Sequence, residues 1–143
     1  MNREVSAVTL APGRGGGAPL LLEEPLSLWG GLDPTTGRII DRWHPQAGAR
    51  VAGRVLMMPA GRGSSSGSAT LAEAIRLEVG PAAILLLKRD PIVIVGALVA
   101  AELYGRLRPV ALIAAGDWAR LGAAGRLEVR AEVDRTGVVV YGA

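Results

Sequence analysis

The chain has 143 residues, half of them hydrophobic, with no Phe and no Cys. This composition predicts a compact, sheet-rich domain, and the lack of Cys excludes disulfides and any zinc or iron–sulfur site held by thiolates of this chain. The formal net charge is +3, but the 15 arginines are scattered from Arg3 to Arg135 without a basic block or interleaved aromatics. Nucleic-acid binding is therefore not expected.

No segment predicts a secretory leader or a membrane span. Residues 1–17 lack the charged-then-apolar pattern of a signal peptide, and the longest apolar run, PIVIVGALVAA at 91–101, is about half as long as a membrane-spanning helix. We expect a cytoplasmic protein without membrane contact, folded as one domain over residues 1–143.

The first part of the chain predicts short strands separated by turns. Residues 4–10, EVSAVTL, are rich in β-branched side chains and predict a strand, and residues 11–19, APGRGGGAP, predict a glycine-rich turn. Residues 20–29 predict a strand that ends near Pro25, because proline cannot donate to a sheet. DPTTG at 33–37 predicts a turn, and residues 50–58 predict a strand that stops at Pro59.

The middle of the chain alternates between strand and helix. TLAEAIRLEV, from Thr70, has helical periodicity, and Thr70 with Glu73 has the spacing of a capping box. Continuous apolar runs at 82–87 and 109–114 are typical of strands buried on both faces. Residues 97–107 predict a helix, which Pro91 would start well, although early Ile and Val residues leave that start open.

The C-terminal part predicts a hairpin. RLEVRAEV at 126–133 alternates so that Leu127, Val129, Ala131 and Val133 face one way, and a turn at DRTG (134–137) leads into VVVY. Trp118 is expected to pack near this hairpin. Together with the right-handed crossovers that the middle segments require, the pattern predicts an α/β domain with a largely β outer layer.

The segment PAGRGSSSGSATLAEAIR, residues 59–76, carries the main functional signal. A strand ends at Met58, a loop of glycines and serines follows, and a helix starts between Ser66 and Thr70. Unpaired N–H groups at a helix start, glycines that permit close approach and serine hydroxyls together suit a carboxylate or phosphate. The segment is no Walker loop, since it lacks Gly-Lys-Ser/Thr. A flexible loop whose hydroxyls only cap the helix is an alternative that stays open.

A serine hydrolase contained in this chain is not expected. His44 is the only histidine, is expected to be structural, and no G-x-S-x-G pattern is present. Asp33, Asp41 and His44 carry metal-binding side chains, but their spacing fits no ligand pattern, so no metal is assigned to the chain. Trp29, in Trp29-Gly30-Gly31, forms part of an interface, borders the site or packs in a turn, and these alternatives stay open.

The motif order resembles a known family. LSLWGGLDPTTGRIIDRWHPQAGARVAGRVLMMPAGRGSSSGSATLAEAIR, followed by GPAAILL, DPIVIVGALVAAELYG and PVALI, resembles the small subunit of the aconitase X family over residues 20–115. That subunit is the free-standing counterpart of the aconitase swivel domain. The resemblance implies a swivelling β/β/α layered domain whose Gly-Ser-Ser loop closes over a substrate.

The resemblance also implies the site residues. The Gly-Ser-Ser motif of the family falls on Gly63, Ser64 and Ser65, which makes Ser64 the catalytic base. Aconitase follows this motif with an arginine, where this chain has Ser66, and that departure puts the arginine's carboxylate-binding role in doubt. Arg62 is a candidate cation from the other side. The predicted substrate-binding residues are therefore Arg62, Gly63, Ser65 and Ser66.

A serine hydroxyl loses its proton only where positive charge is concentrated, so the site has to be shared with a partner. The resemblance implies a heteromer with an aconitase X large subunit that holds iron or an iron–sulfur cluster, acting on a small carboxylate or phosphate. The family's dehydratases act on cis-3-hydroxy-L-proline or on mevalonate 5-phosphate, and the loop and GALVAAELYG favour the first. A non-catalytic binding module that kept the fold stays an alternative.

Overall fold

The computed structural model describes residues 2–134 and 136–142. The helices are α1 (Leu28–Gly31), α2 (Gly67–Arg76), α3 (Pro91–Tyr104) and α4 (Ala115–Gly122). The strands are β1 (Asn2–Ala11), β2 (Gly13–Gly17), β3 (Pro19–Leu21), β4 (Val55–Met58), β5 (Ala83–Leu86), β6 (Val110–Ile113), β7 (Leu127–Ala131) and β8 (Thr136–Gly142). Within the described residues they form one sheet in the order β2-β7-β8-β1-β6-β5-β4-β3.

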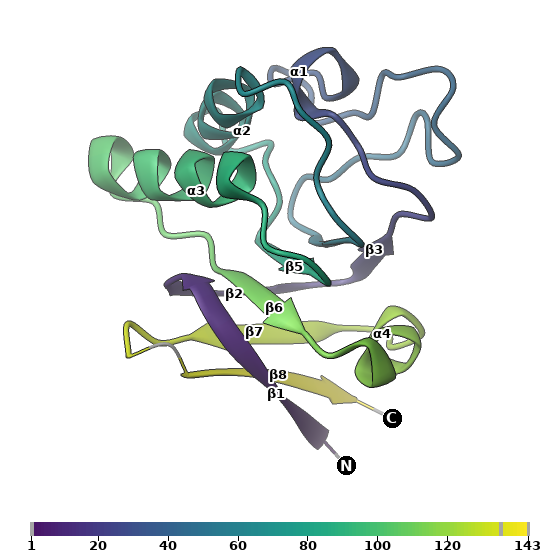
Figure 1. Ribbon diagram of the computed structural model, residues 1–143, viewed down its shortest axis with the longest axis vertical. Coiled ribbons are helices and arrows are strands. Elements are labelled where there is room, and N and C mark those ends of the chain that lie inside the picture. Colours follow the sequence, from purple (N-terminus) through teal and green to yellow (C-terminus); the bar gives the residue numbers. More distant parts are fainter. Residues whose placement is uncertain (1, 135, 143) are drawn as a thin grey trace.

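The sheet has a parallel half and an antiparallel half. Strands β3, β4, β5 and β6 run parallel, and α2 and α3 are the crossovers that join β4 to β5 and β5 to β6. Strand β1 pairs antiparallel with β6 on one side and β8 on the other, and β7 pairs with β8 and β2. Figure 1 shows α1, α2 and α3 gathered over the parallel strands, with β1, β7 and β8 on the opposite side.

Two hydrophobic clusters hold the layers together, and the side chains of β4 show how. Leu56 and Met58 belong to the cluster under α1, α2 and α3, whereas Val55 and Met57 belong to the cluster shared with β7, β8 and α4. All four are fully buried, as expected for a strand covered on both faces. The layered α/β arrangement expected from the sequence is confirmed, and the strands predicted at 82–87 and 109–114 form over 83–86 and 110–113. The helix predicted over 97–107 is present, begins at Pro91, where the start had been left open, and ends at Tyr104.

The prediction of a glycine-rich turn at 11–19 is wrong, because Gly13–Gly17 form strand β2. A Cβ on Gly15 would lie 2.1 Å from the backbone oxygen of Ala82, and one on Gly17 would lie 2.2 Å from that of Gly53. The glycines are therefore needed because β2 runs against other backbone segments, not because the chain turns here.

Two strands are shorter than predicted. Strand β3 covers only Pro19–Leu21, and the chain bends before it reaches Pro25. Strand β4 begins at Val55, since residues 52–54 form a turn in which Gly53 has a φ of 69°. The predicted turn at 33–37 is confirmed: the Asp33 carboxylate accepts hydrogen bonds from the N–H and hydroxyl of Thr35 at 2.9 and 2.7 Å.

The predicted capping box does not form. Helix α2 already begins at Gly67, within the predicted window, so Thr70 lies inside the helix, is buried, and directs its hydroxyl to the Ser66 carbonyl at 3.4 Å.

Helix α4 was not predicted. Its Trp118 packs against the cluster that contains Val129 and Val139 of the hairpin, as expected. No helix among the described residues is long and apolar enough to cross a membrane.

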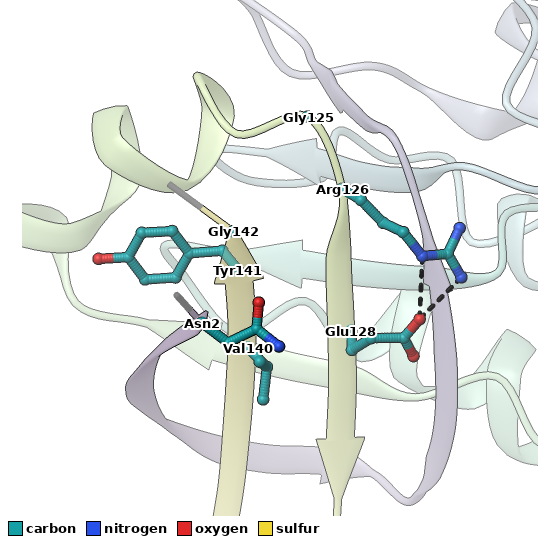
Figure 2. Close-up of a pocket in the computed structure, with 7 residues that line it drawn as sticks. All are labelled: Asn2, Gly125, Arg126, Glu128, Val140, Tyr141 and Gly142. Atoms are coloured by element: carbon teal, nitrogen blue, oxygen red, sulfur yellow. Dashed lines mark hydrogen bonds and ion pairs between the residues drawn. The ribbon is translucent and has the colours of Figure 1, made fainter.

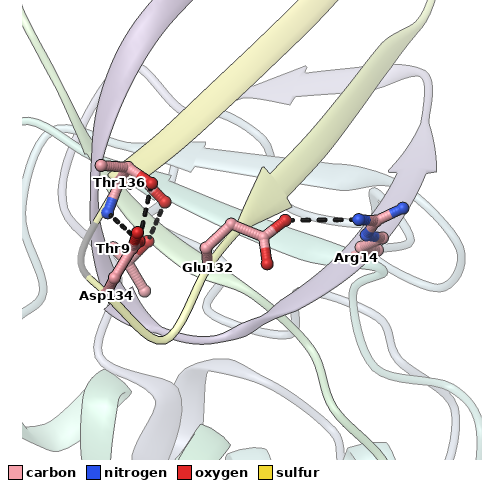
Figure 3. Close-up of polar contacts among 5 residues, drawn as sticks. All are labelled: Thr9, Arg14, Glu132, Asp134 and Thr136. Atoms are coloured by element: carbon pink, nitrogen blue, oxygen red, sulfur yellow. Dashed lines mark hydrogen bonds and ion pairs between the residues drawn. The ribbon is translucent and has the colours of Figure 1, made fainter.

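The C-terminal hairpin of β7 and β8 is confirmed, although its predicted turn at 134–137 includes residue 135, which lies outside the described residues. Val133 was predicted to face the same way as Leu127, Val129 and Ala131, but it lies beyond the end of β7 and is 84% exposed, whereas the other three are buried. Beside the turn, Thr136 donates its N–H and hydroxyl to the Asp134 carboxylate and accepts a 2.8 Å hydrogen bond from the Thr9 hydroxyl (Figure 3). The two hydrogen bonds that Thr136 donates lower the pKa of Asp134. The hydrogen bond from Thr9 joins β1 to β8.

Candidate functional site

The serine loop, defined here as residues 59–66, leaves β4 at the carboxyl end of the parallel strands and leads into α2. The carboxyl end of a parallel sheet is where α/β proteins place their ligands. The base of the loop is held from both sides: Gly61 forms a β-bridge with Leu26, and the Pro59 carbonyl accepts hydrogen bonds from the N–H groups of Leu87 and Lys88 at 3.2 and 3.1 Å. The loop base is therefore fixed to the segments that follow β3 and β5.

The tip of the loop holds the five residues predicted from the sequence. Arg62, Gly63, Ser64, Ser65 and Ser66 are consecutive and all exposed, so the structure brings them together on the surface. A Cβ placed on Gly63 would meet nothing within 4 Å, which leaves open space beside the tip. The Arg62 guanidinium makes no ion pair with any described residue.

Ser64 sits where the loop becomes helix. Its Oγ accepts a hydrogen bond from the backbone N–H of Ser66 at 3.2 Å, and its carbonyl accepts one from the N–H of Gly67 at 3.0 Å. Ser66 is the N-cap residue of α2, and its side chain makes no capping hydrogen bond. The alternative in which the serines only cap the helix therefore does not describe Ser66, and the Ser64 oxygen lies at the positive end of α2.

The start of α2 packs between helices α1 and α3. A Cβ on Gly67 would lie 3.1 Å from Cγ2 of Ile92 in α3 and 3.3 Å from Cβ of Leu28 in α1. The Ser68 hydroxyl donates a 2.7 Å hydrogen bond to the Ile92 carbonyl. These contacts leave no room for a side chain at Gly67 and set the direction in which α2 leaves the loop.

The sequence analysis missed one residue beneath the loop. Asp90 is the N-cap of α3 and is only 8% exposed; its Oδ1 accepts a 2.9 Å hydrogen bond from the N–H of Ile92. Its Oδ2 lies against Gly61, where an added Cβ would come within 1.3 Å of it. The signal that could have found it is the Asp-Pro pair at the start of a predicted helix, which is typical of an N-cap followed by the first helical position.

The histidine and carboxylates weighed as metal ligands serve local structure. The N–H of Gln46 donates to Nδ1 of His44 at 3.0 Å, so the ring proton is on Nε2, which donates to the Glu24 carbonyl at 3.0 Å. His44 is thus buried with both ring nitrogens engaged in hydrogen bonds. Asp41 accepts from the N–H of Trp43, and the hydrogen bonds from the Thr35 hydroxyl and N–H lower the pKa of Asp33.

Iron and iron–sulfur centres need several thiolate, imidazole or carboxylate ligands close together. The chain has no Cys, and within residues 2–134 and 136–142 no three His, Asp or Glu side chains are grouped so that they could hold a metal ion. The donor set of these residues does not fit such a centre, and no chemical step is assigned to a metal on this chain.

The larger hollows of the surface do not include the serine loop. One of about 410 Å³ lies beside the chain termini, where Arg126 is paired with Glu128 at 2.7 Å (Figure 2). It is lined by Asn2, Gly125, Arg126, Glu128, Val140, Tyr141 and Gly142. Another of about 420 Å³ lies at the carboxyl ends of β5 and β6 and is mostly apolar. The tip of the serine loop, residues 62–66, lies exposed outside both of these hollows.

The surface around the loop carries both cations and large apolar side chains. Lys88 and Arg89, which follow β5, are exposed like Arg62. The segment from α1 to residue 43, which lies against the start of α2 at Trp29, exposes Trp29, Ile40 and, at 93%, Trp43. Exposed aromatic residues of this size are typical of a surface that another protein covers.

The sequence matches the family described as the aconitase X swivel domain over residues 4–139. It is 47% identical to a cis-3-hydroxy-L-proline dehydratase of Pseudomonas aeruginosa over 85% of this chain but 22% of that protein. It is 43% identical to the phosphomevalonate dehydratase small subunit of Methanothermobacter thermautotrophicus, over 68% of this chain and 74% of that subunit.

The structure is similar to the crystal structure of Thermococcus kodakaraensis aconitase X in its holo form. The TM-score is 0.80 and the sequence identity 25%, and the alignment covers 99% of both chains. The fold, including the layer of helices over the parallel strands, is thus shared along the whole length of this chain. In contrast, the chain spans about a fifth of the length of the Pseudomonas dehydratase, so most of that enzyme has no counterpart here.

Proposed function

The chain belongs to the aconitase X swivel domain family, and from this premise we propose that it is the loop-bearing component of a dehydratase whose active site is completed by a larger component. The observation that carries the proposal is the position of Ser64, exposed at the tip of the serine loop with its Oγ at the positive end of α2. In this function the chain contributes the base, and the partner contributes the rest of the pocket.

Ser64 would act as the base that removes the proton. Its oxygen takes a proton from the carbon next to the one that bears the hydroxyl, the C–H electrons form the double bond, and the hydroxyl leaves as water after it has gained a proton. The N–H of Ser66 and the dipole of α2 stabilise the deprotonated Ser64 oxygen, because both place positive charge beside it. Arg62 and the backbone at Gly63 would bind an anionic group of the substrate, with Ser65 and Ser66 as further donors.

A partner is required because the chain places too little positive charge around Ser64 at the tip of the serine loop. One N–H and a helix terminus lower the pKa of a serine far less than a base needs, so further cations have to approach from another surface. The exposed apolar residues beside the loop, Trp29, Ile40 and Trp43, support a partner that covers this end of the molecule. We assign iron or an iron–sulfur cluster to that larger component, since the described residues do not offer a ligand set for it.

The substrate we propose first is cis-3-hydroxy-L-proline. The support is the 47% identity to the Pseudomonas dehydratase over 128 residues, a stretch that includes most of this chain. The substrate's carboxylate is the group that the helix terminus and Arg62 would bind.

Mevalonate 5-phosphate is the second candidate. It is favoured by the 43% identity to an archaeal small subunit that resembles this chain over 74% of its own length. It is also favoured by the three exposed cations at this end of the sheet, Arg62, Lys88 and Arg89, since a phosphate takes more cationic donors than a carboxylate.

The proposal is tested by reconstituting the chain with an aconitase X large subunit and measuring water loss from both substrates. The Ser64→Ala complex should assemble like wild type and lose turnover on the true substrate, while Ser6→Ala, an exposed serine on β1, should keep it. If the Ser64→Ala complex turns over like wild type, the proposed base is wrong. Tight ligand binding by the chain alone, with no turnover in any complex, would instead favour the binding module.

A further inference from the structure

The base of the serine loop rests on a buried carboxylate. Gly61 stands three residues before Ser64 and is bridged to Leu26. A Cβ on Gly61 would lie 1.3 Å from Oδ2 of Asp90 and 2.5 Å from its Cγ. The Asp90 side chain thus fills the space into which any larger residue at position 61 would project.

Gly61 is needed for space and not for its backbone conformation. Its φ is not among the positive values of the described glycines, so an alanine could adopt the same backbone angles. The same Cβ would lie 3.4 Å from Cβ of Asp90, which is an ordinary contact distance. Only the carboxylate of Asp90 therefore prevents an alanine at position 61.

Asp90 is itself held in place. Its Oδ1 caps α3 through the N–H of Ile92 at 2.9 Å, and its carbonyl accepts the N–H of Ile94 at 3.1 Å. The side chain cannot turn away from Gly61 without losing the cap, and it is almost fully buried. One carboxylate thus connects the start of α3 to the base of the serine loop.

We propose that Asp90 is a positioning residue for Ser64: its Oδ1 fixes the start of α3, and its Oδ2 provides the surface on which the loop base is seated. This inference rests on the proposed function, because the position of Ser64 matters only if Ser64 acts on a substrate. Displacing a reacting group by about 1 Å can lower a rate about a hundredfold, so a small shift at Gly61 has a large effect on turnover.

The test compares Gly61→Ala, Asp90→Ala and the double variant in the reconstituted complex, with Gly116→Ala as a matched control. Gly116 has open space around it and no positive φ, so its substitution should change nothing. Gly61→Ala should lower kcat at least about tenfold and leave KM within about twofold, because the substrate still binds. In the Asp90→Ala background the same substitution should change kcat by less than about twofold, because the clash has been removed.

A second readout needs no activity. In the isolated chain, the amide ¹⁵N and ¹H shifts of Ser66, whose N–H binds Ser64 Oγ, should move in Gly61→Ala and return toward the Asp90→Ala values in the double variant. Asp90→Asn keeps the size and the cap and should retain more of the kcat than Asp90→Ala does. If Gly61→Ala does not fold, the double variant should still fold. A kcat of the double variant within about twofold of that of Asp90→Ala then supports the inference, and a larger fall overturns it.

The inference would be overturned if Gly61→Ala lowered kcat by the same factor in the wild-type and the Asp90→Ala backgrounds. A Gly61→Ala complex with wild-type kcat would also overturn it. Either result, together with loss of turnover in Ser64→Ala, would leave the proposed function standing. If Ser64→Ala itself is fully active, the proposed function fails, and the Ser66 shifts alone still report whether Asp90 seats the loop.

Discussion

The backbone N–H of Ser66 donates a hydrogen bond to Oγ of Ser64 across 3.2 Å, at the point where the serine loop becomes helix α2. A donor in this position stabilises negative charge on the serine oxygen and holds the side chain in one orientation. The bond is local, between residues two apart, so it does not depend on a partner. In the proposed function, further positive charge and enclosure come from the partner.

Strand β2 should not tolerate a side chain at Gly15. Gly15→Ala would place a Cβ 2.1 Å from the backbone oxygen of Ala82. Neither backbone can move freely, because Gly15 is paired with Val129 in the sheet and the N–H of Ala82 donates to the Arg54 carbonyl at 2.9 Å. We expect a loss of about 2 kcal/mol or more in the free energy of unfolding, measured by urea denaturation. Gly125→Ala, which meets nothing within 4 Å, is the control; equal stability of the two variants would contradict the role of β2.

Gly67→Val should loosen the start of α2. Its side chain would have to enter the corner between Ile92 and Leu28, where even a Cβ is 3.1–3.3 Å from its neighbours. We expect a destabilisation of about 1–3 kcal/mol and faster amide exchange at residues 66–69 than in the wild type. Unchanged exchange at these amides would show that α1 and α3 do not hold the helix start.

Asp134 should have a pKa below its ordinary value of 3.8, because the hydroxyl and the N–H of Thr136 donate to its carboxylate. A lowered pKa in the folded state stabilises the fold above the unfolded pKa, and this contribution is lost as the pH falls through the folded pKa. Thr136→Val removes the hydroxyl and should raise the pKa toward 3.8, as followed by NMR titration. The equivalent pair of Asp33 and Thr35 is the internal control, and its titration should not change.

Trp43 should contribute to assembly and not to the fold. It is 93% exposed, so Trp43→Ala should leave the thermal unfolding midpoint unchanged and weaken binding to the large component about tenfold or more, measured by calorimetry. Val133→Ala is the matched control, since Val133 is also exposed and belongs to the β7–β8 turn region. If both variants bind as tightly as the wild type, the partner does not cover the surface beside the loop.

The parts of the fold that follow from short stretches of sequence were predictable. The apolar run that became β5 and the Pro-initiated helix α3 each carry their own local signal. Strand β2 does not, because five residues that include four glycines have no strand preference, and the backbones that explain Gly15 and Gly17, those of Ala82 and Gly53, are distant in the sequence. Helix α4 is short and begins without a side-chain cap, so nothing local marks its start.

The candidate site likewise combines residues with a local sequence signal and residues that only the folded chain brings together. The serine loop could be located from its composition and from the helix that follows, and its five predicted residues lie together at the tip. Asp90 could not be assigned to the site, because its contact with Gly61 joins residues 29 positions apart on different loops. The position of the His44 ring likewise depends on the Glu24 carbonyl, which only the folded chain brings to it.

The central claim, that this chain supplies a serine base to a shared dehydratase site, is tested most directly by the kcat of the reconstituted complex with Ser64→Ala. The account predicts a fall of about a hundredfold to ten-thousandfold on the true substrate, with the complex assembled and its melting temperature unchanged. A Ser64→Ala complex that removes water as fast as the wild type would contradict the account.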